Sequence, residues 1–268
     1  MTALRFWTGE ELSMQIIPAV SVANAPFGAE RLAADWISVN VPGLGVSLAA
    51  VTRPTGAGPW PAVLLLHGSH GFAQEYVKLA NDLSRGGLLG VAACWFEGGS
   101  GEGTRFISPI ACPDAPPRPD PLSDDALRTV GALIQAVRSL PDVLPDALGI
   151  LGHSRGGGAT LNYILRKADV RAAVLNSARY PSELRNLASE LKVPLLMLHG
   201  TADSPADGGT QFTNVEMARD FERMLSAAGK PVEAVYYEGG RHNGIFESSA
   251  QYRDEVQRML AFLQRQLR

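Results

Sequence analysis

The stretch Gly152-His-Ser-Arg-Gly156 constrains this chain more than any other. An apolar run leads up to it and ends at Leu151, and residues 159–167 behind it are compatible with a helix. A serine between two glycines, after a strand and before a helix, is typical of a sharp and strained turn in which larger neighbours would collide with strand and helix. The pattern also occurs by chance, so its context decides. We expect Ser154 to project above the end of a sheet, beside a helix N-terminus that favours negative charge.

The order of the apolar segments predicts an α/β fold. Alternating residues at 36–41, a Pro-Gly turn and the run at 46–52 indicate an antiparallel hairpin. The later strands alternate with helices, which indicates a mostly parallel eight-stranded sheet with helices on both faces and an antiparallel first edge. Its other strands are expected at 61–66, 88–95, 147–151, 172–176, 194–198 and 232–237, and the helices at 72–85, 123–140, 159–167, 214–228 and 248–267.

The chain divides into an extension and one domain. With 268 residues, of which 46% are hydrophobic, it is long enough for a single large core. Residues 1–35 have no clear period and are predicted to form an N-terminal extension, with a short helix near 8–15. Residues 36–268 form the predicted catalytic domain. The Gly/Pro-rich segment at about 96–121 is interpreted as an insertion over the carboxyl end of the sheet, and a disordered surface loop is the alternative.

Composition limits the partners. The net charge of −3 suggests neither nucleic acid nor an anionic membrane, and no apolar run is long enough to cross a bilayer. No signal peptide is apparent, so the cytoplasm is the expected location. Free thiols are then favoured for Cys94 and Cys112, although a disulfide stays open because the loop with Cys112 could reach the strand end at Cys94. No Cys/His spacing is typical of a metal site. The oligomeric state, including a homo-oligomer, is left open.

All five histidines of the chain fall in loops that follow predicted strands. The carboxyl ends of parallel strands share one edge, where sites form in such sheets. A serine hydroxyl needs a base, for which histidine is suited at neutral pH, and the resulting imidazolium needs a carboxylate. We predict His242, after the last strand, as the base and Asp203 as the carboxylate, with Asp207 as its rival in the same loop. His153 and His199 are expected to be structural.

Two further sets of residues complete the predicted site. The amide of Arg155 would be one donor to an oxyanion, and the second would come from the loop after His67-Gly68, from Ser69 or else His70. The substrate pocket is expected around the segment at 96–121, because apolar side chains there suit a substrate tail. These side chains are Trp95, Phe96, Phe106 and Ile110.

Taken together, these motifs resemble the α/β-hydrolase superfamily, and within it the dienelactone hydrolase-like branch. The resemblance extends from about 36 to 268 and implies the α/β-hydrolase fold. The dienelactone enzymes proper use a cysteine nucleophile, whereas this chain has Ser154, which favours ordinary esters over dienelactones. The residues that carry the resemblance are Leu64-Leu-Leu-His-Gly68, Gly152-His-Ser-Arg-Gly-Gly157, Leu198-His-Gly-Thr-Ala-Asp203 and Gly240-Arg-His242.

The sequence therefore predicts a serine carboxylic-ester hydrolase that acts through an acyl-enzyme on small to medium esters. Its partner is a small-molecule ester, and it needs no cofactor. One alternative is a serine peptidase resembling the catalytic domain of prolyl oligopeptidases, on fold-level analogy. Another is a hydrolase-like binding protein whose triad is unused. Acyl length, alcohol size and stereochemistry do not follow from the sequence.

Overall fold

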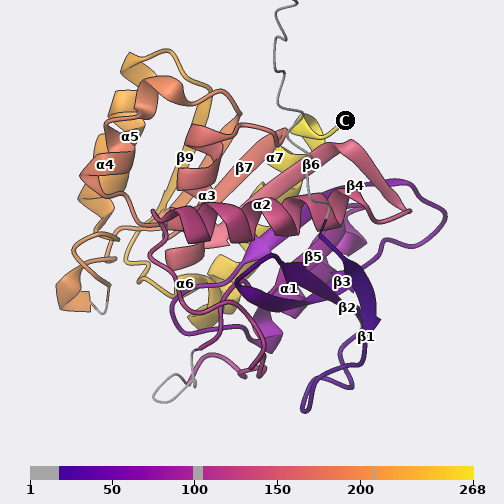
Figure 1. Ribbon diagram of the computed structural model, residues 1–268. Coiled ribbons are helices and arrows are strands. Elements are labelled where there is room, and N and C mark those ends of the chain that lie inside the picture. Colours follow the sequence, from indigo (N-terminus) through magenta and orange to yellow (C-terminus); the bar gives the residue numbers. More distant parts are fainter. Residues whose placement is uncertain (1–17, 99–104, 208) are drawn as a thin grey trace, which may run out of the picture.

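A computed structural model describes residues 18–98, 105–207 and 209–268 of the chain. Within these ranges the structure contains one nine-stranded sheet flanked by helices (Figure 1). The strand order is β1-β2-β3-β5-β4-β6-β7-β8-β9. The strands are β1 (Val20–Ala23), β2 (Asp35–Val41), β3 (Gly45–Thr52), β4 (Trp60–Leu66), β5 (Leu89–Ala93), β6 (Val143–His153), β7 (Ala172–Asn176), β8 (Leu195–Gly200) and β9 (Val232–Tyr237).

The first edge of the sheet is antiparallel, as the sequence predicts. Strands β1, β2 and β3 pair antiparallel, β3 pairs antiparallel with β5, and the strands from β5 to β9 in the sheet order are parallel. The prediction of eight strands is wrong by one, because β1 adds to the edge with Val22 opposite Ile37. Strand β1 has only four residues and no buried one, so it gives no apolar alternation to detect. Residues 20–23 of the predicted extension thus belong to the sheet, and the helix expected near 8–15 lies outside the described residues.

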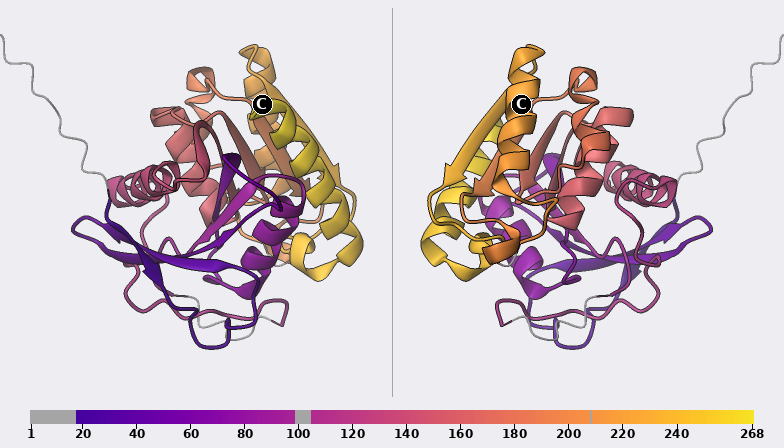
Figure 2. Two further views of the ribbon diagram at one scale, coloured as in Figure 1. Left: turned by 90° about the vertical axis from the view of Figure 1, so that its right-hand side faces the viewer. Right: turned by 90° about the vertical axis from the view of Figure 1, so that its left-hand side faces the viewer.

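Helices cover both faces of the sheet (Figure 2). Side chains of α2, α3 and α5 pack on one face, and those of α1 and α7 pack on the other. Alternate residues of β4 serve the two faces, since Leu64 and Leu66 join the first cluster while Val63 and Leu65 join the second. The long helices are α1 (Gln74–Arg85), α2 (Asp124–Arg138), α3 (Arg155–Arg166), α5 (Val215–Ala227) and α7 (Ser249–Gln266), and the short ones are α4 (Ser182–Arg185), α6 (Gly244–Glu247), η1 (Ala188–Glu190) and η2 (Pro205–Asp207).

Capping residues fix the starts of the helices close to where the sequence predicts them. The hydroxyl of Ser123 accepts a hydrogen bond from the Ala126 amide at the start of α2. The Asn214 side chain accepts one from the Glu216 amide at the start of α5. Each bond satisfies an N–H group that has no partner inside its helix. Among the described residues, no helix is long and apolar enough to cross a membrane.

The described part of the segment after β5 is held against the domain. The Gln74 amide donates to Ser108 O at 2.9 Å, and the Ile110 amide donates to Phe72 O at 2.9 Å. Cys94 and Cys112 form a disulfide, so the expectation of two free thiols is wrong. The bond joins the residue after β5 to the middle of the segment, a contact that spacing alone left open.

Candidate active site

The serine turn has the strained geometry that its sequence predicts. Ser154 lies between β6 and α3 with φ 53° and ψ −113°, a conformation rare for a residue with a side chain. Its amide donates to Asn176 O at 2.9 Å. A Cβ on Gly152 would lie 2.3 Å from Gly156 O, and a Cβ on Gly156 would lie 2.3 Å from Leu66 O. Both glycines are therefore required for the chain to turn this tightly.

The structure brings Ser154, His242 and Asp203 together in one hydrogen-bonded row. His242 Nε2 lies 2.9 Å from Ser154 Oγ, and His242 Nδ1 lies 2.8 Å from Asp203 Oδ2. Burial acts to raise the pKa of Asp203, but hydrogen bonds from His199 and His242 outweigh it and hold that pKa below its ordinary value. An ionised carboxylate only accepts, so Nδ1 of His242 carries the hydrogen. Nε2 is then free to accept the Ser154 hydroxyl proton.

Asp203 is fully buried and held by several donors. Thr213 Oγ1 donates to its Oδ1 at 3.1 Å, and His199 Nε2 lies 3.1 Å from its Oδ2. His199 Nε2 also donates to Thr213 O at 2.8 Å, so this histidine bonds locally, as expected. These contacts fix the carboxylate for His242. The side chain of Asp207, the rival acid, lies outside the described part of the structure.

The loop after β4 meets the start of α3 next to Ser154. Arg155 is the first residue of α3, so its amide is at the helix N-terminus. Its guanidinium donates from Nε to Ser69 Oγ at 3.1 Å and from Nη1 to Pro119 O at 2.8 Å. The arginine thus ties together the two residues whose amides are the predicted oxyanion donors. His70 instead pairs with the Tyr76 hydroxyl at 2.8 Å.

The predicted pocket residues separate into core and rim. Trp95 and Phe96 have no exposed surface, so the prediction that they line an open pocket is wrong. Their rings pack around His67, whose carbonyl accepts from Trp95 Nε1 at 2.9 Å. Ile110 is also buried. Their apolar character reflects the core, which composition alone does not distinguish from a pocket.

Phe106 is the predicted pocket residue that keeps exposed surface, and it has a partner that the sequence reasoning missed. Its ring stacks on Phe246 of α6, with centroids 6.2 Å apart and planes 8° apart. Phe246 also contacts the rings of His70 and His153. The pair therefore borders the row that contains Ser154. The signal for Phe246 was its place in the sequence, four residues after His242.

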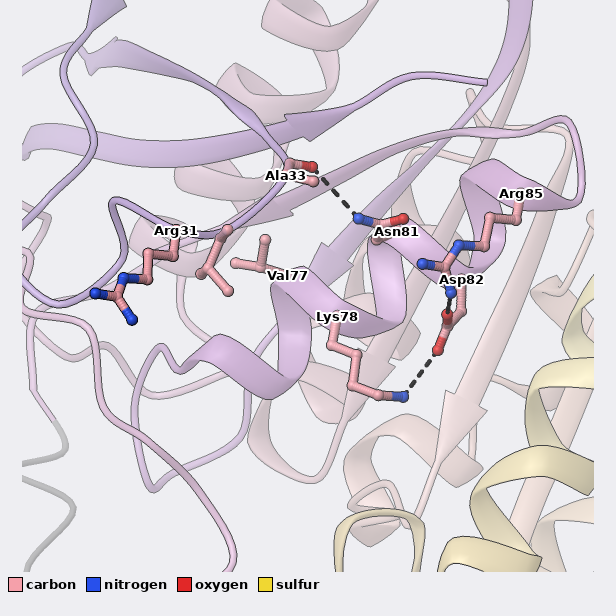
Figure 3. A pocket seen from close by; sticks show the side chains of 8 residues that line it. Arg31, Ala33, Val77, Lys78, Asn81, Asp82 and Arg85 are labelled. Atoms are coloured by element: carbon pink, nitrogen blue, oxygen red, sulfur yellow. Dashed lines mark hydrogen bonds and ion pairs between the residues drawn. The ribbon is translucent and has the colours of Figure 1, made fainter. Parts of the chain in front are cut away.

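A separate hollow lies on the outer side of α1 (Figure 3). It has a volume of about 210 Å³, and residues 31–33 form its other wall. Its one carboxylate is paired, because Asp82 accepts from both Lys78 and Arg85. None of the predicted site residues lines it. Within the described ranges, no cluster of His, Cys, Asp and Glu could hold a metal ion.

The mostly parallel sheet and the strained serine turn at its carboxyl edge define an α/β hydrolase. The chain belongs to the dienelactone hydrolase family, whose model matches residues 48–266. The resemblance inferred from the sequence motifs is confirmed.

Individual relatives are distant. The uncharacterized protein YfhR of Salmonella typhi is 29% identical over 178 residues, which are 54% of this chain and 56% of that protein. This chain therefore spans about half the length of that relative. A dienelactone hydrolase structure from Anabaena variabilis aligns over 94% of this chain and 100% of its own, with a TM-score of 0.61 and 19% identity. A fungal esterase structure from Rhizomucor miehei aligns over 94% and 85%, with a TM-score of 0.64 and 18% identity. At such identities these structures show the fold.

Proposed function

We propose that this hydrolase is a serine carboxylic-ester hydrolase that acts through an acyl-enzyme on small to medium esters. The observation that carries the proposal is the hydrogen-bonded row of Ser154, His242 and Asp203. It has the order of nucleophile, base and carboxylate that activates a serine hydroxyl. Ser154 also lies directly before the N-terminus of α3, where negative charge is stabilised.

The proposed reaction uses these groups twice. Ser154 Oγ attacks the ester carbonyl carbon while His242 Nε2 takes its proton, and the amides of Arg155 and Ser69 hold the oxyanion of the tetrahedral intermediate. The carbon–alkoxide bond then breaks, and His242 returns the proton to the leaving alcohol. Water attacks the acyl-enzyme by the same route and releases the acid. Asp203 holds the imidazole and stabilises its charged form throughout.

The pocket that we propose differs from the one expected from the sequence. We place the apolar part of the substrate against Phe106 and Phe246, whose stacked rings lie beside His70 and His153. The described end of the segment at 105–121 supports this placement, since Arg155 binds Pro119 O and so holds the segment next to the serine turn. Trp95 and Phe96 are not part of this pocket and instead pack against His67.

The test is a substrate panel. Nitrophenyl esters of increasing acyl length and aminoacyl anilides are compared for the parent, for Ser154→Ala and for Ser182→Ala, an exposed serine in α4 that serves as the control. We expect ester turnover in the parent and the control and a loss of several orders of magnitude in Ser154→Ala. Turnover of anilides without esters would instead indicate the peptidase, and no turnover of either class would indicate the binding protein.

A further inference from the structure

A buried polar chain runs behind the serine turn, outside the row of Ser154, His242 and Asp203. It starts at Glu255 of α7, whose side chain is 1% exposed. One carboxyl oxygen faces Gln251 Nε2 at 2.7 Å, and the other faces Asn176 Nδ2 at 2.5 Å. Asn176 Oδ1 lies 2.6 Å from His153 Nδ1, and His153 Nε2 lies 3.2 Å from Asn243 Oδ1. Four side chains from distant parts of the sequence thus form one continuous path.

This path contacts the candidate site at two places, the serine turn and the loop that carries His242. Asn176 accepts the Ser154 amide on its backbone carbonyl at 2.9 Å. His153 precedes Ser154 directly, and its ring centroid lies 5.5 Å from that of His242. Asn243, the end of the path, follows His242 in the chain. Any change in the path therefore reaches the loop that carries the proposed base.

Counting protons shows that the path has two arrangements. Burial and the nearby His242 lower the pKa of His153 to about 4, so its ring carries one N–H at neutral pH. Both of its nitrogens nevertheless face an asparagine side-chain oxygen. One of the two amides must therefore present its nitrogen to the ring. Either the side-chain amide of Asn243 or that of Asn176 is therefore turned over, so that its nitrogen and oxygen exchange places.

The state of Glu255 decides between them. If Asn176 turns, its oxygen faces the Glu255 carboxyl, which must then donate a hydrogen; His153 carries its hydrogen on Nε2 and donates to Asn243 Oδ1. If Glu255 is ionised, Asn176 keeps its N–H group toward the carboxylate. His153 then carries its hydrogen on Nδ1, and Asn243 must turn to donate to Nε2.

Glu255 is suited to hold that proton at neutral pH. Burial raises its pKa to about 8, against the hydrogen bonds from Gln251 and Asn176, and the neighbouring Asp254 acts in the same direction as burial. From β9, Tyr237 also interacts with it electrostatically, and burial raises the pKa of that phenol. Neither neighbouring acid group favours an anion at Glu255.

We propose that Glu255 is a positioning residue of this site: its protonation state sets the orientation of Asn176 and the tautomer of His153, and through them holds Asn243 and the His242 loop. The inference rests on the proposed function for its effect on turnover, whereas the tautomer of His153 does not depend on what the protein hydrolyses. In the neutral arrangement the Asn243 side chain accepts from His153, and the base loop is braced. Ionisation of Glu255 at alkaline pH reverses this hydrogen bond, because Asn243 must turn to donate to His153, and the His242 loop is then held in a different arrangement.

Kinetics provides the first test. The kcat and kcat/KM of nitrophenyl acetate hydrolysis are measured from pH 5 to 10 for the parent, Glu255→Gln and Glu190→Gln, an exposed glutamate that serves as the matched control. The parent and control should lose kcat with a midpoint near pH 8. Glu255→Gln stays neutral and its amide can donate to Asn176, so its kcat should remain level there. The same alkaline loss in all three proteins overturns the proposal.

A second test needs neither a variant nor esterase activity. Nitrogen-15 chemical shifts of the labelled histidines in the parent protein report which ring nitrogen of His153 carries hydrogen. We expect the hydrogen on Nε2 at pH 6.5 and on Nδ1 at pH 9.5. One unchanged tautomer across this range contradicts the inference, whatever the protein hydrolyses. A switching tautomer in a protein without ester turnover would keep this device and reject the proposed function.

Discussion

Substituting Gly156 by alanine tests the packing that produces the serine turn. The new Cβ would lie 2.3 Å from Leu66 O and 2.6 Å from His67 O, both backbone atoms at the end of β4. Relief requires a movement of about 1 Å, since non-bonded heavy atoms prefer roughly 3.5 Å. Such overpacking costs about 1–3 kcal/mol, and the gain in helix propensity returns about 1 kcal/mol. Because α3 carries Ser154, a shift of this size should also lower kcat/KM by about 100-fold.

Gly158, in the same helix, provides the matched control. A Cβ there would meet Arg179 and Pro121 at 3.4 and 3.5 Å, which is ordinary contact. Gly158→Ala should therefore stabilise the protein by about 0.5–1 kcal/mol and leave turnover unchanged. Urea denaturation followed by circular dichroism gives both free energies of unfolding, and ester hydrolysis gives kcat/KM. Equal stability and equal activity of the two variants would refute the steric account of the turn.

Three other changes test separate parts of the account. Asp203→Asn should lower kcat by up to about 10⁴-fold, while Asp207→Asn should lower it little. The reverse ranking in steady-state kinetics would show that Asp207, and not Asp203, is the carboxylate partner of His242. Phe106→Ala should change the ratio of kcat/KM between long and short acyl esters more than it changes the melting temperature, and an unmoved ratio would place the pocket elsewhere. Glu255→Gln should gain stability relative to the parent by about 1.4 kcal/mol per pH unit as pH rises from 4.5 toward 8, because the unfolded parent releases the proton in that window while the folded parent keeps it. A difference that is flat with pH would contradict the raised pKa of Glu255.

The features that the sequence predicts correctly are those whose cause is local. Gly152 and Gly156 are required by contacts within one turn, so their spacing identifies it. The continuous apolar run of β4 reflects burial on both faces. Because parallel strands end at the same edge of a sheet, the order of the strands along the chain was enough to predict that Asp203 and His242 lie near Ser154.

The features that the sequence missed depend on contacts between distant segments. An apolar residue such as Trp95 looks the same in a core as in a pocket, and only the packing around His67 separates the two. Strand β1 is recognisable from its pairing with β2, not from its four residues. Glu255 lies in the last helix, 79 residues from Asn176, and nothing local marks it as buried. A single sequence carries no signal for such pairs.

The most direct test of the account is to identify the residue that forms the acyl-enzyme. The intact protein is treated with a fluorophosphonate, and the modified peptide is located by mass spectrometry, in parallel with Ser154→Ala. Our account predicts one adduct, on Ser154, formed at the same rate as ester turnover is lost, and no adduct in the variant. An adduct on another serine, or complete inactivation with Ser154 unmodified, would contradict it.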